Sequence, residues 1–191
     1  LRVASSVTEI PDRTFAGSSL GDPNSSLLEV QLPQGLLVIG NHAFYRCIAL
    51  RTIIIPSTVN VIGSHAFCGC NSLLEVDLPE GLQTIEEFLF WGCGSLRRVK
   101  IPSTVTHILR FTFKECHSLI SLDLPVGLQF IGTHAFADCY ALTTVAIPST
   151  VTEIGTCAFY NCSGLLSVEL PEGLQRFGNC TFSNCSSLVN V

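Results

Sequence analysis

The sequence predicts a mostly β solenoid, in which 23-residue coils stack with a parallel sheet on one face and without long helices. Three observations carry this prediction. Proline recurs every 23 residues from Pro33 to Pro171, and cysteine recurs at the same interval from Cys47 to Cys185. Phenylalanine keeps the same spacing, at Phe44, Phe67, Phe90, Phe113, Phe136, Phe159 and Phe182. A fixed period of this length is typical of stacked repeats, because one such unit is too short to bury its own apolar face.

The first element of each coil is a predicted strand with the pattern L-x-x-V-x-L/I. In the third full repeat, Val76 and Leu78 have the inward phase of this alternation. Glu75 and Asp77 have the outward phase. An alternation of two residues is the period of a half-buried strand. Proline follows and ends the strand, because it donates no ladder hydrogen bond.

The second element of each coil is the return segment L/V-x-x-I-G-x-x-A-F. It carries no helical pattern long enough for a full helix. We therefore expect a short strand or a turn-like return, with at most a brief helical turn. Parallel stacking at ~4.8 Å then places each repeated side chain against its copy in the next coil.

The period organises the chain into a single domain, residues 1–191. Residues 1–23 are an atypical first repeat with an insertion near residues 17–23, residues 24–184 are seven 23-residue repeats, and residues 185–191 are a partial repeat. Leu1 and Val191 occupy the same phase of the repeat. We therefore expect this chain to be a fragment of a longer one.

Composition argues against several classes of function. The net charge is −5 and the 10 lysines and arginines are spread thinly, so we expect no binding to nucleic acid. Pro, Gly, Ser or a charge interrupts every apolar run before about 18 residues, so direct insertion of this segment into a membrane is not expected. A solenoid filled by stacked columns leaves no room for a catalytic pocket. We predict that the chain is not an enzyme and has no cofactor.

The repeat resembles a known family. The unit at residues 139–161, CYALTTVAIPSTVTEIGTCAFYN, is similar to the BspA-type, or Treponema-type, leucine-rich repeat. The shared marks are C-x-x-L, the I/L-P that closes the strand, I-G, and A-F followed three residues later by Cys. The departures are Glu86 and Leu109 for Gly, Leu89, Thr112 and Thr181 for Ala, and Asn24 for the first Cys. The resemblance implies a leucine-rich-repeat solenoid that binds protein, often at the cell surface or outside the cell, where such proteins mediate adhesion.

The cysteines are interpreted as structural. Seven of the 10 belong to the 23-residue column and are expected to be buried, reduced thiols. Cys157 and Cys180 fall on neighbouring coils, and a disulfide between them stays open. Together with Cys162 and Cys185 they form two C-x4-C pairs, a loose zinc spacing. Repetition creates such spacings by itself, so we expect no metal site.

Two further patterns resemble functional motifs. His42, His65 and His134 share one phase of the repeat, but only the first two lie in adjacent coils. We interpret this column as half-buried packing. The segment Gly17–Gly21 matches G-x-S-x-G, which works only on a strand-to-helix turn. No helical pattern follows it, so we expect a polar surface loop.

The outward strand positions are the candidate binding surface, because a repeat protein presents its regular face to partners. Acidic and basic pairs alternate there, which favours cross-strand attraction. Trp91 lies instead on the loop after the Phe column, in the same phase as Tyr45 and Tyr160. The candidate partner-binding residues are Glu75, Asp77, Arg97, Arg98, Lys100, Asp123 and Trp91.

The function predicted from these features is a non-catalytic scaffold for protein–protein interaction. It binds a protein partner of unknown identity through the sheet face or the loop rim, and surface adhesion is one such role. The alternative is a structural spacer or an assembly subunit within a larger rod or complex.

Overall fold

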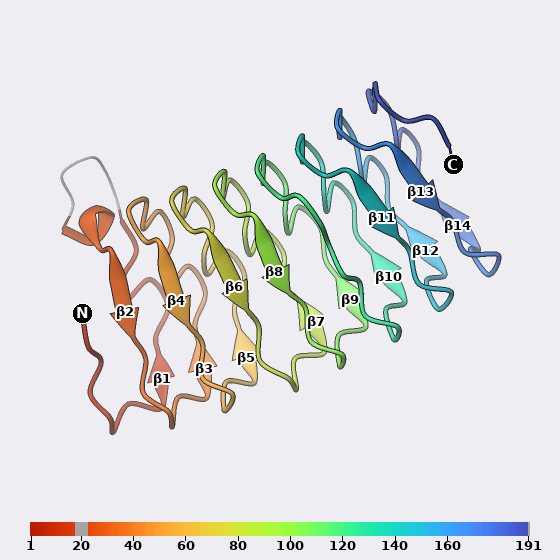
Figure 1. The fold of residues 1–191 in the computed structure, drawn as a ribbon. Coiled ribbons are helices and arrows are strands. Elements are labelled where there is room, and N and C mark those ends of the chain that lie inside the picture. The colour runs from red at the N-terminus through yellow and green to blue at the C-terminus, as the bar shows by residue number, and fades with distance from the viewer. Residues whose placement is uncertain (18–22, 191) are drawn as a thin grey trace.

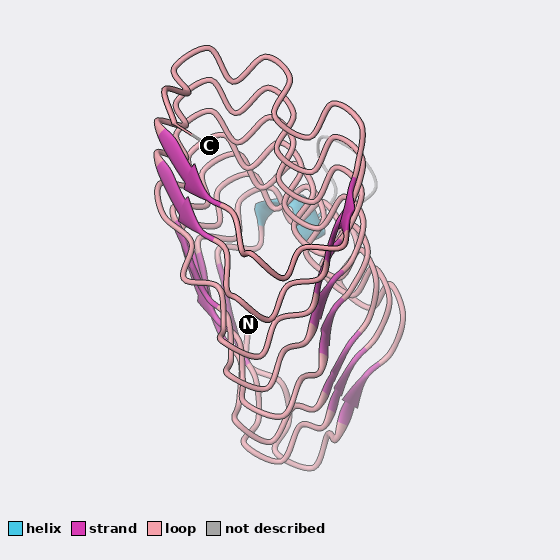
Figure 2. Ribbon diagram, turned by 90° about the vertical axis from the view of Figure 1, so that its right-hand side faces the viewer, coloured by secondary structure: helices cyan, strands magenta, loops and turns pink. Residues whose placement is uncertain are grey.

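The computed structural model describes residues 1–17 and 23–190, which wind into an elongated solenoid with the termini at opposite ends (Figure 1). Every strand pairing is parallel. Short strands lie on two sides of the coil, joined by loops (Figure 2). The predicted solenoid of 23-residue coils without long helices is confirmed. The inserted residues 18–22, with most of the G-x-S-x-G pattern, lie outside the described residues.

The predicted strand after each leucine forms the first side, which we call the sheet face. Its three-residue strands are β2 (Glu29–Gln31), β4 (Thr52–Ile54), β6 (Glu75–Asp77), β8 (Arg98–Lys100), β11 (Thr144–Ala146) and β13 (Ser167–Glu169). In each strand the central residue is buried and the last is exposed. This is the alternation that the sequence predicts.

The return segment forms the second side, which we call the return face. Of the options that the sequence left open, these coils adopt the short strand. The strands have two residues each: β1 (Glu9–Ile10), β3 (Val38–Ile39), β5 (Val61–Ile62), β7 (Thr84–Ile85), β9 (His107–Ile108), β10 (Phe130–Ile131), β12 (Glu153–Ile154) and β14 (Arg176–Phe177). In the described part of the chain the one helix is a 3-10 turn, η1 (Pro23–Ser26). No helix there is long and apolar enough to cross a bilayer.

Paired residues are 23 positions apart in every ladder but one. Glu9 pairs with Val38, 29 positions later, because the inserted residues lie between these two coils. The sheet face is interrupted where an isolated bridge, Ser121 to Thr144, replaces a strand. Among the described residues, no strand pairing joins β5 to β7. That gap lies at the coil in which Glu86 replaces the usual glycine.

The interior is a set of columns. The Phe rings stack from Phe15 to Phe182, with neighbouring centroids 5.1 to 5.7 Å apart. The cysteine column lies beside this stack, and each thiol donates a hydrogen bond to a Phe carbonyl of the preceding coil. Cys70 Sγ, for example, lies 3.1 Å from the Phe44 oxygen. Cys70, Cys93, Cys116, Cys139 and Cys162 are buried free thiols, as the sequence predicts.

Candidate protein-binding surfaces

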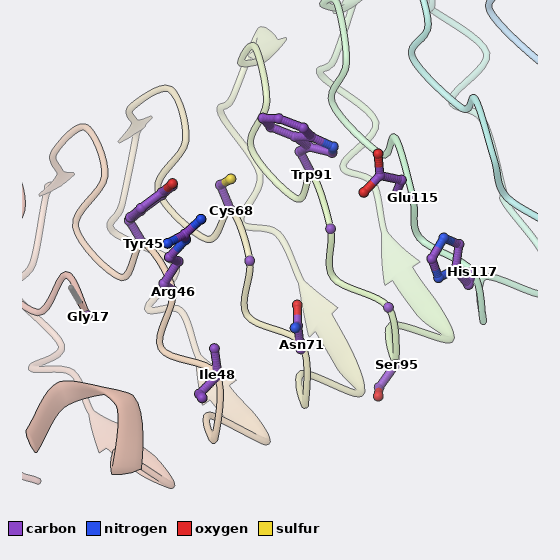
Figure 3. Close-up of a pocket in the computed structure, with 13 residues that line it drawn as sticks. Gly17, Tyr45, Arg46, Ile48, Cys68, Asn71, Trp91, Ser95, Glu115 and His117 are labelled. Atoms are coloured by element: carbon purple, nitrogen blue, oxygen red, sulfur yellow. The ribbon is translucent and has the colours of Figure 1, made fainter. Parts of the chain in front are cut away.

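A groove runs along the loops that follow the Phe column, on the rim of the solenoid (Figure 3). We call it the rim groove. Its volume is about 820 Å³. The lining residues come from successive coils and are Gly17, Tyr45, Arg46, Ile48, Cys68, Gly69, Asn71, Trp91, Gly92, Gly94, Ser95, Glu115 and His117.

The rim groove exists because two consecutive coils lack a side chain at the same phase. This phase has positive φ in each coil, 56° at Arg46, 73° at Gly69, 74° at Gly92 and 63° at Glu115. Glycine adopts this conformation without steric cost, whereas a residue with a Cβ atom, such as Arg46 or Glu115, adopts it at some cost in energy. The two glycines leave the floor open, and the charged side chains of Arg46 and Glu115 bound it on either side (Figure 3).

Aromatic side chains form the wall of the rim groove. The Trp91 ring packs on Phe88 with centroids 5.6 Å apart, and Lys114 Nζ lies 6.0 Å from the Trp91 ring centroid. Trp91 Nε1 is buried without a hydrogen-bond partner in the described part of the chain. The Arg46 guanidinium carbon lies 5.4 Å from the Tyr45 ring centroid. These contacts hold the two aromatic rings in place on the rim.

The floor of the rim groove also contains one thiol, that of Cys68. Burial raises its pKa to about 11, while the neighbouring Arg46 lowers it and Glu115 raises it slightly further. The thiol therefore stays protonated at neutral pH, and a thiolate is the nucleophilic form. The groove thus presents polar, aromatic and neutral sulfur groups to a ligand.

A second hollow of about 590 Å³ lies on the sheet face over β2, β4 and β6. Ile54 is 79% exposed at this hollow. In the lining of this hollow, Arg98 Nη2 lies 3.4 Å from Glu75 Oε2 and 3.0 Å from Asp77 Oδ1. All three charged side chains remain more than half exposed. The hollow therefore combines the exposed apolar side chain of Ile54 with an ion-paired charge cluster.

The sequence model of a family described as "BspA type leucine rich repeat region" matches residues 1–119 and 106–191 of this chain. This chain belongs to that family. A leucine-rich repeat protein of Treponema pallidum is 30% identical with a TM-score of 0.69, and the match covers 99% of this chain and 77% of that one. No curated protein sequence is similar enough to be a match.

Two other solved structures share the fold of this BspA-type chain. A leucine-rich repeat protein of Eubacterium ventriosum is 21% identical with a TM-score of 0.74, over 89% of this chain and 48% of that one. The pneumococcal vaccine antigen PcpA is 23% identical with a TM-score of 0.54, over 93% and 57%. Leucine-rich repeat proteins are generally non-catalytic and generally mediate protein interaction or surface adhesion.

The BspA-type coils bring some of the predicted partner-binding residues together and separate others. Arg98 lies against Glu75 and Asp77, and Lys100 is the register partner of Asp77. Asp123 lies in the coil in which the ladder is interrupted, two residues after the bridge residue Ser121. The structure therefore gathers four of these residues on adjacent strands.

The remaining predicted residues are placed differently. Arg97 is exposed next to β8, and Trp91 lies in the rim groove, away from the sheet-face hollow. The alternation of the strand already gives Ile54 an outward position, and the structure shows it 79% exposed, but it was not among the predicted binding residues. Sequence reasoning missed the rim groove itself, whose signal is the pair Gly69 and Gly92 at one repeat phase.

The predicted half-buried column is a second aromatic stack on the BspA-type solenoid. Consecutive ring centroids are 4.4 to 5.0 Å apart from His42 through His65, Phe88 and Phe111 to His134. Burial lowers the pKa of all three histidines. In the described part of the chain, no group of three or more acidic, His or Cys side chains is placed to hold a metal.

Proposed function

We propose that this BspA-type chain is a non-catalytic scaffold that binds a protein partner through the rim groove. The carrying observation is the groove itself: about 820 Å³, floored by Gly69 and Gly92 and walled by Trp91 and Tyr45. Binding energy at protein interfaces concentrates in a few anchors, and Trp, Tyr and Arg are the most frequent. The groove holds one of each within a short stretch of the rim.

The charged residues of the rim groove determine the orientation in which a partner segment would bind. Arg46 and Glu115 are three coils apart, which corresponds to ~14 Å at a coil spacing of ~4.8 Å. An extended segment of about four to five residues spans that length at ~3.3 Å per residue. Arg46 favours an acidic side chain at its end of such a segment, because opposite charges set orientation and register. At the other end Glu115 already pairs with Lys114 Nζ at 3.2 Å, so a basic side chain of the partner competes with that contact.

The sheet-face hollow supports a second candidate surface. Ile54 is the specific observation, since it is 79% exposed among charged neighbours. Against it, Arg98 is already paired with Glu75 and Asp77, so a partner has to compete with contacts inside the chain. We place the rim groove first because it offers the aromatic side chains of Trp91 and Tyr45, and no aromatic residue lines the sheet-face hollow in the described part of the chain.

The test is selection of binders from a displayed library of random peptides. Peptides enriched on the wild-type chain are then measured by calorimetry against Trp91→Ala and against the control Arg98→Ala/Lys100→Ala. We expect at least a tenfold loss of affinity for Trp91→Ala and little change for the control. If the affinity of the selected peptides falls only in the Arg98→Ala/Lys100→Ala variant, the binding site lies on the sheet face and not in the rim groove. Failure to enrich any peptide would favour the spacer or assembly alternative.

A further inference from the structure

A row of exposed side chains runs along the solenoid, between the loops of the rim groove and the strands of the sheet face. It occupies the position after the inward leucine of each coil. In alternate coils this position is apolar, and these residues are 39 to 59% exposed: Leu28, Leu74, Ile120 and Leu166. The coils between the first three carry the exposed Arg51 and Arg97. We call these six residues the leucine–arginine stripe.

The regular spacing of the stripe distinguishes it from ordinary exposed apolar residues. Single exposed leucines are common on protein surfaces. Here the apolar residue recurs every 46 positions, which is twice the 23-residue period and ~9.6 Å along the solenoid. The same coils carry the turn P-x-G-L after the strand, whereas the coils between them carry P-S-T-V. A regular exposed apolar row of this kind is typical of an interaction surface.

Charged side chains in and beside the stripe lack partners. Among the described residues, no ion pair is formed by two arginines of the stripe and two exposed acids of the sheet face: Arg51, Arg97, Asp123 and Glu169. Asp123 lies three residues after the stripe residue of its own coil, and so does Glu169. The chain therefore presents two free cations and two free anions along one side of the solenoid.

The spacing of the stripe indicates what can bind along it. Its side chains follow one another at ~4.8 Å, the distance between parallel strands. Side chains on one face of an extended segment repeat at ~6.6 Å, and the turns of a helix repeat at about 5.4 Å. Between Leu28 and Ile120, four coils apart, such segments fall out of step with the stripe by ~7 Å and ~2.4 Å respectively. A second copy of this chain has the same coil spacing and stays in step.

The two arginines restrict how two copies can face each other. In a parallel pair related by a two-fold axis along the solenoid, each coil faces its own copy, so Arg51 meets Arg51 and Arg97 meets Arg97. Like charges placed opposite each other oppose association. In an antiparallel two-fold pair, a coil that carries arginine can face a coil that carries an apolar residue, and the two sheet faces lie on the same side of the interface. Such a pair closes at two chains.

One antiparallel register pairs the free arginines with the free carboxylates. It places Arg97 of one copy against Ile120 of the second copy. Asp123 of the second copy then lies three residues further along its chain, towards the sheet face. An arginine spans a similar diagonal within this chain, since Arg98 Nη2 lies 3.0 Å from Asp77 Oδ1 of the neighbouring coil. Arg97 can therefore pair with Asp123 of the second copy.

The same register places Arg51 against Leu166 of the second copy, with Glu169 three residues further along. We propose that this chain forms an antiparallel homodimer along the leucine–arginine stripe, in which each free arginine pairs with a free carboxylate of the other copy. The dimer does not involve the partner proposed for the rim groove. An interface one stripe wide is at the small end of specific interfaces, so the dimer dissociates on dilution.

Sedimentation velocity of the wild-type chain over a range of concentrations tests the dimer. We expect the weight-average mass to rise from that of one chain towards that of two. Ile120→Ser and Leu166→Ser should each weaken self-association at least tenfold, because each removes an apolar contact under a paired arginine. Val126→Ser is the matched control, since Val126 is 79% exposed in the turn after Pro125, outside the stripe. It should associate as the wild type does, and equal unfolding temperatures of the variants exclude a loss of fold.

An exchange of charges tests the register. Arg97→Asp should weaken self-association at least tenfold, and Arg97→Asp/Asp123→Arg should restore it to within about threefold of the wild type. The proposal is overturned if the wild type sediments as a single chain at every concentration up to about 1 mM, in which case the stripe belongs to a different partner. It is also overturned if Val126→Ser weakens association as much as Ile120→Ser does, or if the exchange at positions 97 and 123 restores nothing.

Discussion

His42 and His65 stack face to face, with ring centroids 4.5 Å apart and planes 8° from parallel. The stack continues from His65 to Phe88 at 4.4 Å. A histidine can replace a phenylalanine in this column only as long as its ring stays neutral, because a second positive charge at this distance is repelled by the first. The stack therefore connects the stability of the solenoid to pH.

Acidification should destabilise the chain through this stack. Burial, then the neighbouring His42, lowers the pKa of His65 below 6.5, although Glu87 opposes the shift and Arg13 adds to it. The folded state thus binds this proton less tightly than the unfolded state does. The neutral His65 ring therefore contributes in full to the free energy of unfolding above about pH 6.5, and this contribution is lost as the pH falls through the pKa of His65 in the folded state. We expect His65→Phe to flatten the fall in unfolding temperature between pH 7.5 and 5.0 by a few degrees. An unchanged slope would contradict this account.

Gly63 should resist substitution. A Cβ atom there would lie 2.6 Å from the Asn41 nitrogen and 2.8 Å from the Gly40 carbonyl carbon, both backbone atoms of the preceding coil. Gly63→Ala therefore forces two coils apart, and we expect a loss of about 1–3 kcal/mol in the free energy of unfolding. Gly35 has no atom within 4 Å of the same position, so Gly35→Ala should stay within about 0.5 kcal/mol. Urea denaturation measures both, and equal effects would argue against close coil contact.

The Phe spine should dominate the stability of the core. Phe113 is 0% exposed and its ring lies 5.4 Å from Phe90 and 5.3 Å from Phe136. Removing it leaves a cavity that neighbouring coils cannot fill, so Phe113→Ala should cost about 3–5 kcal/mol. Phe177 is 49% exposed, and Phe177→Ala should cost less than about 1 kcal/mol. If Phe113→Ala does not fold, Phe113→Leu is the substitute. It should unfold at a lower urea concentration than both the wild type and the Phe177→Ala variant do.

Glu86 should destabilise the chain at neutral pH. Burial and then the neighbouring Glu87 raise the pKa of its carboxyl group. The folded state thus holds the Glu86 proton more tightly than the unfolded state does. The protonated carboxyl group therefore contributes to the free energy of unfolding in full below about pH 4.3, and this contribution is lost as the pH rises through the pKa of the folded state. The carboxylate remains partly in water, so we expect Glu86→Gln to gain only about 0.5 kcal/mol or less at pH 7.

The gain from Glu86→Gln should shrink towards pH 4, where the wild-type carboxyl group is itself protonated. Glu172→Gln is the control, because Glu172 is exposed. It should change the unfolding temperature equally little at both pH values. A gain for Glu86→Gln that is independent of pH would mean that charge is not the cause.

The columns of the solenoid could be predicted because repetition determines them. Once copies of a coil stack in register, a residue such as Phe113 lies against Phe90 and Phe136, 23 positions away on each side. Its burial then follows from the period alone. The same reasoning predicts the buried thiols of the cysteine column and the half-buried histidine stack.

The candidate surfaces could be predicted only in part. Arg98 lies beside Glu75 because both occupy one phase of adjacent strands, and this followed from the period. The rim groove follows from a different cause, the omission of side chains at Gly69 and Gly92 in a conformation with positive φ. A sequence shows the glycines but not the sign of φ, nor that Trp91 and Tyr45 close the wall around them.

The sequence by itself therefore determined the period, the filled interior and the membership of each column, because neighbours in the stack are copies of one another. Only the tertiary structure decided which surface positions are hollow, which charges are already paired, and which cysteines face solvent. Those properties depend on contacts between unlike residues of adjacent coils, and no repeat period encodes them.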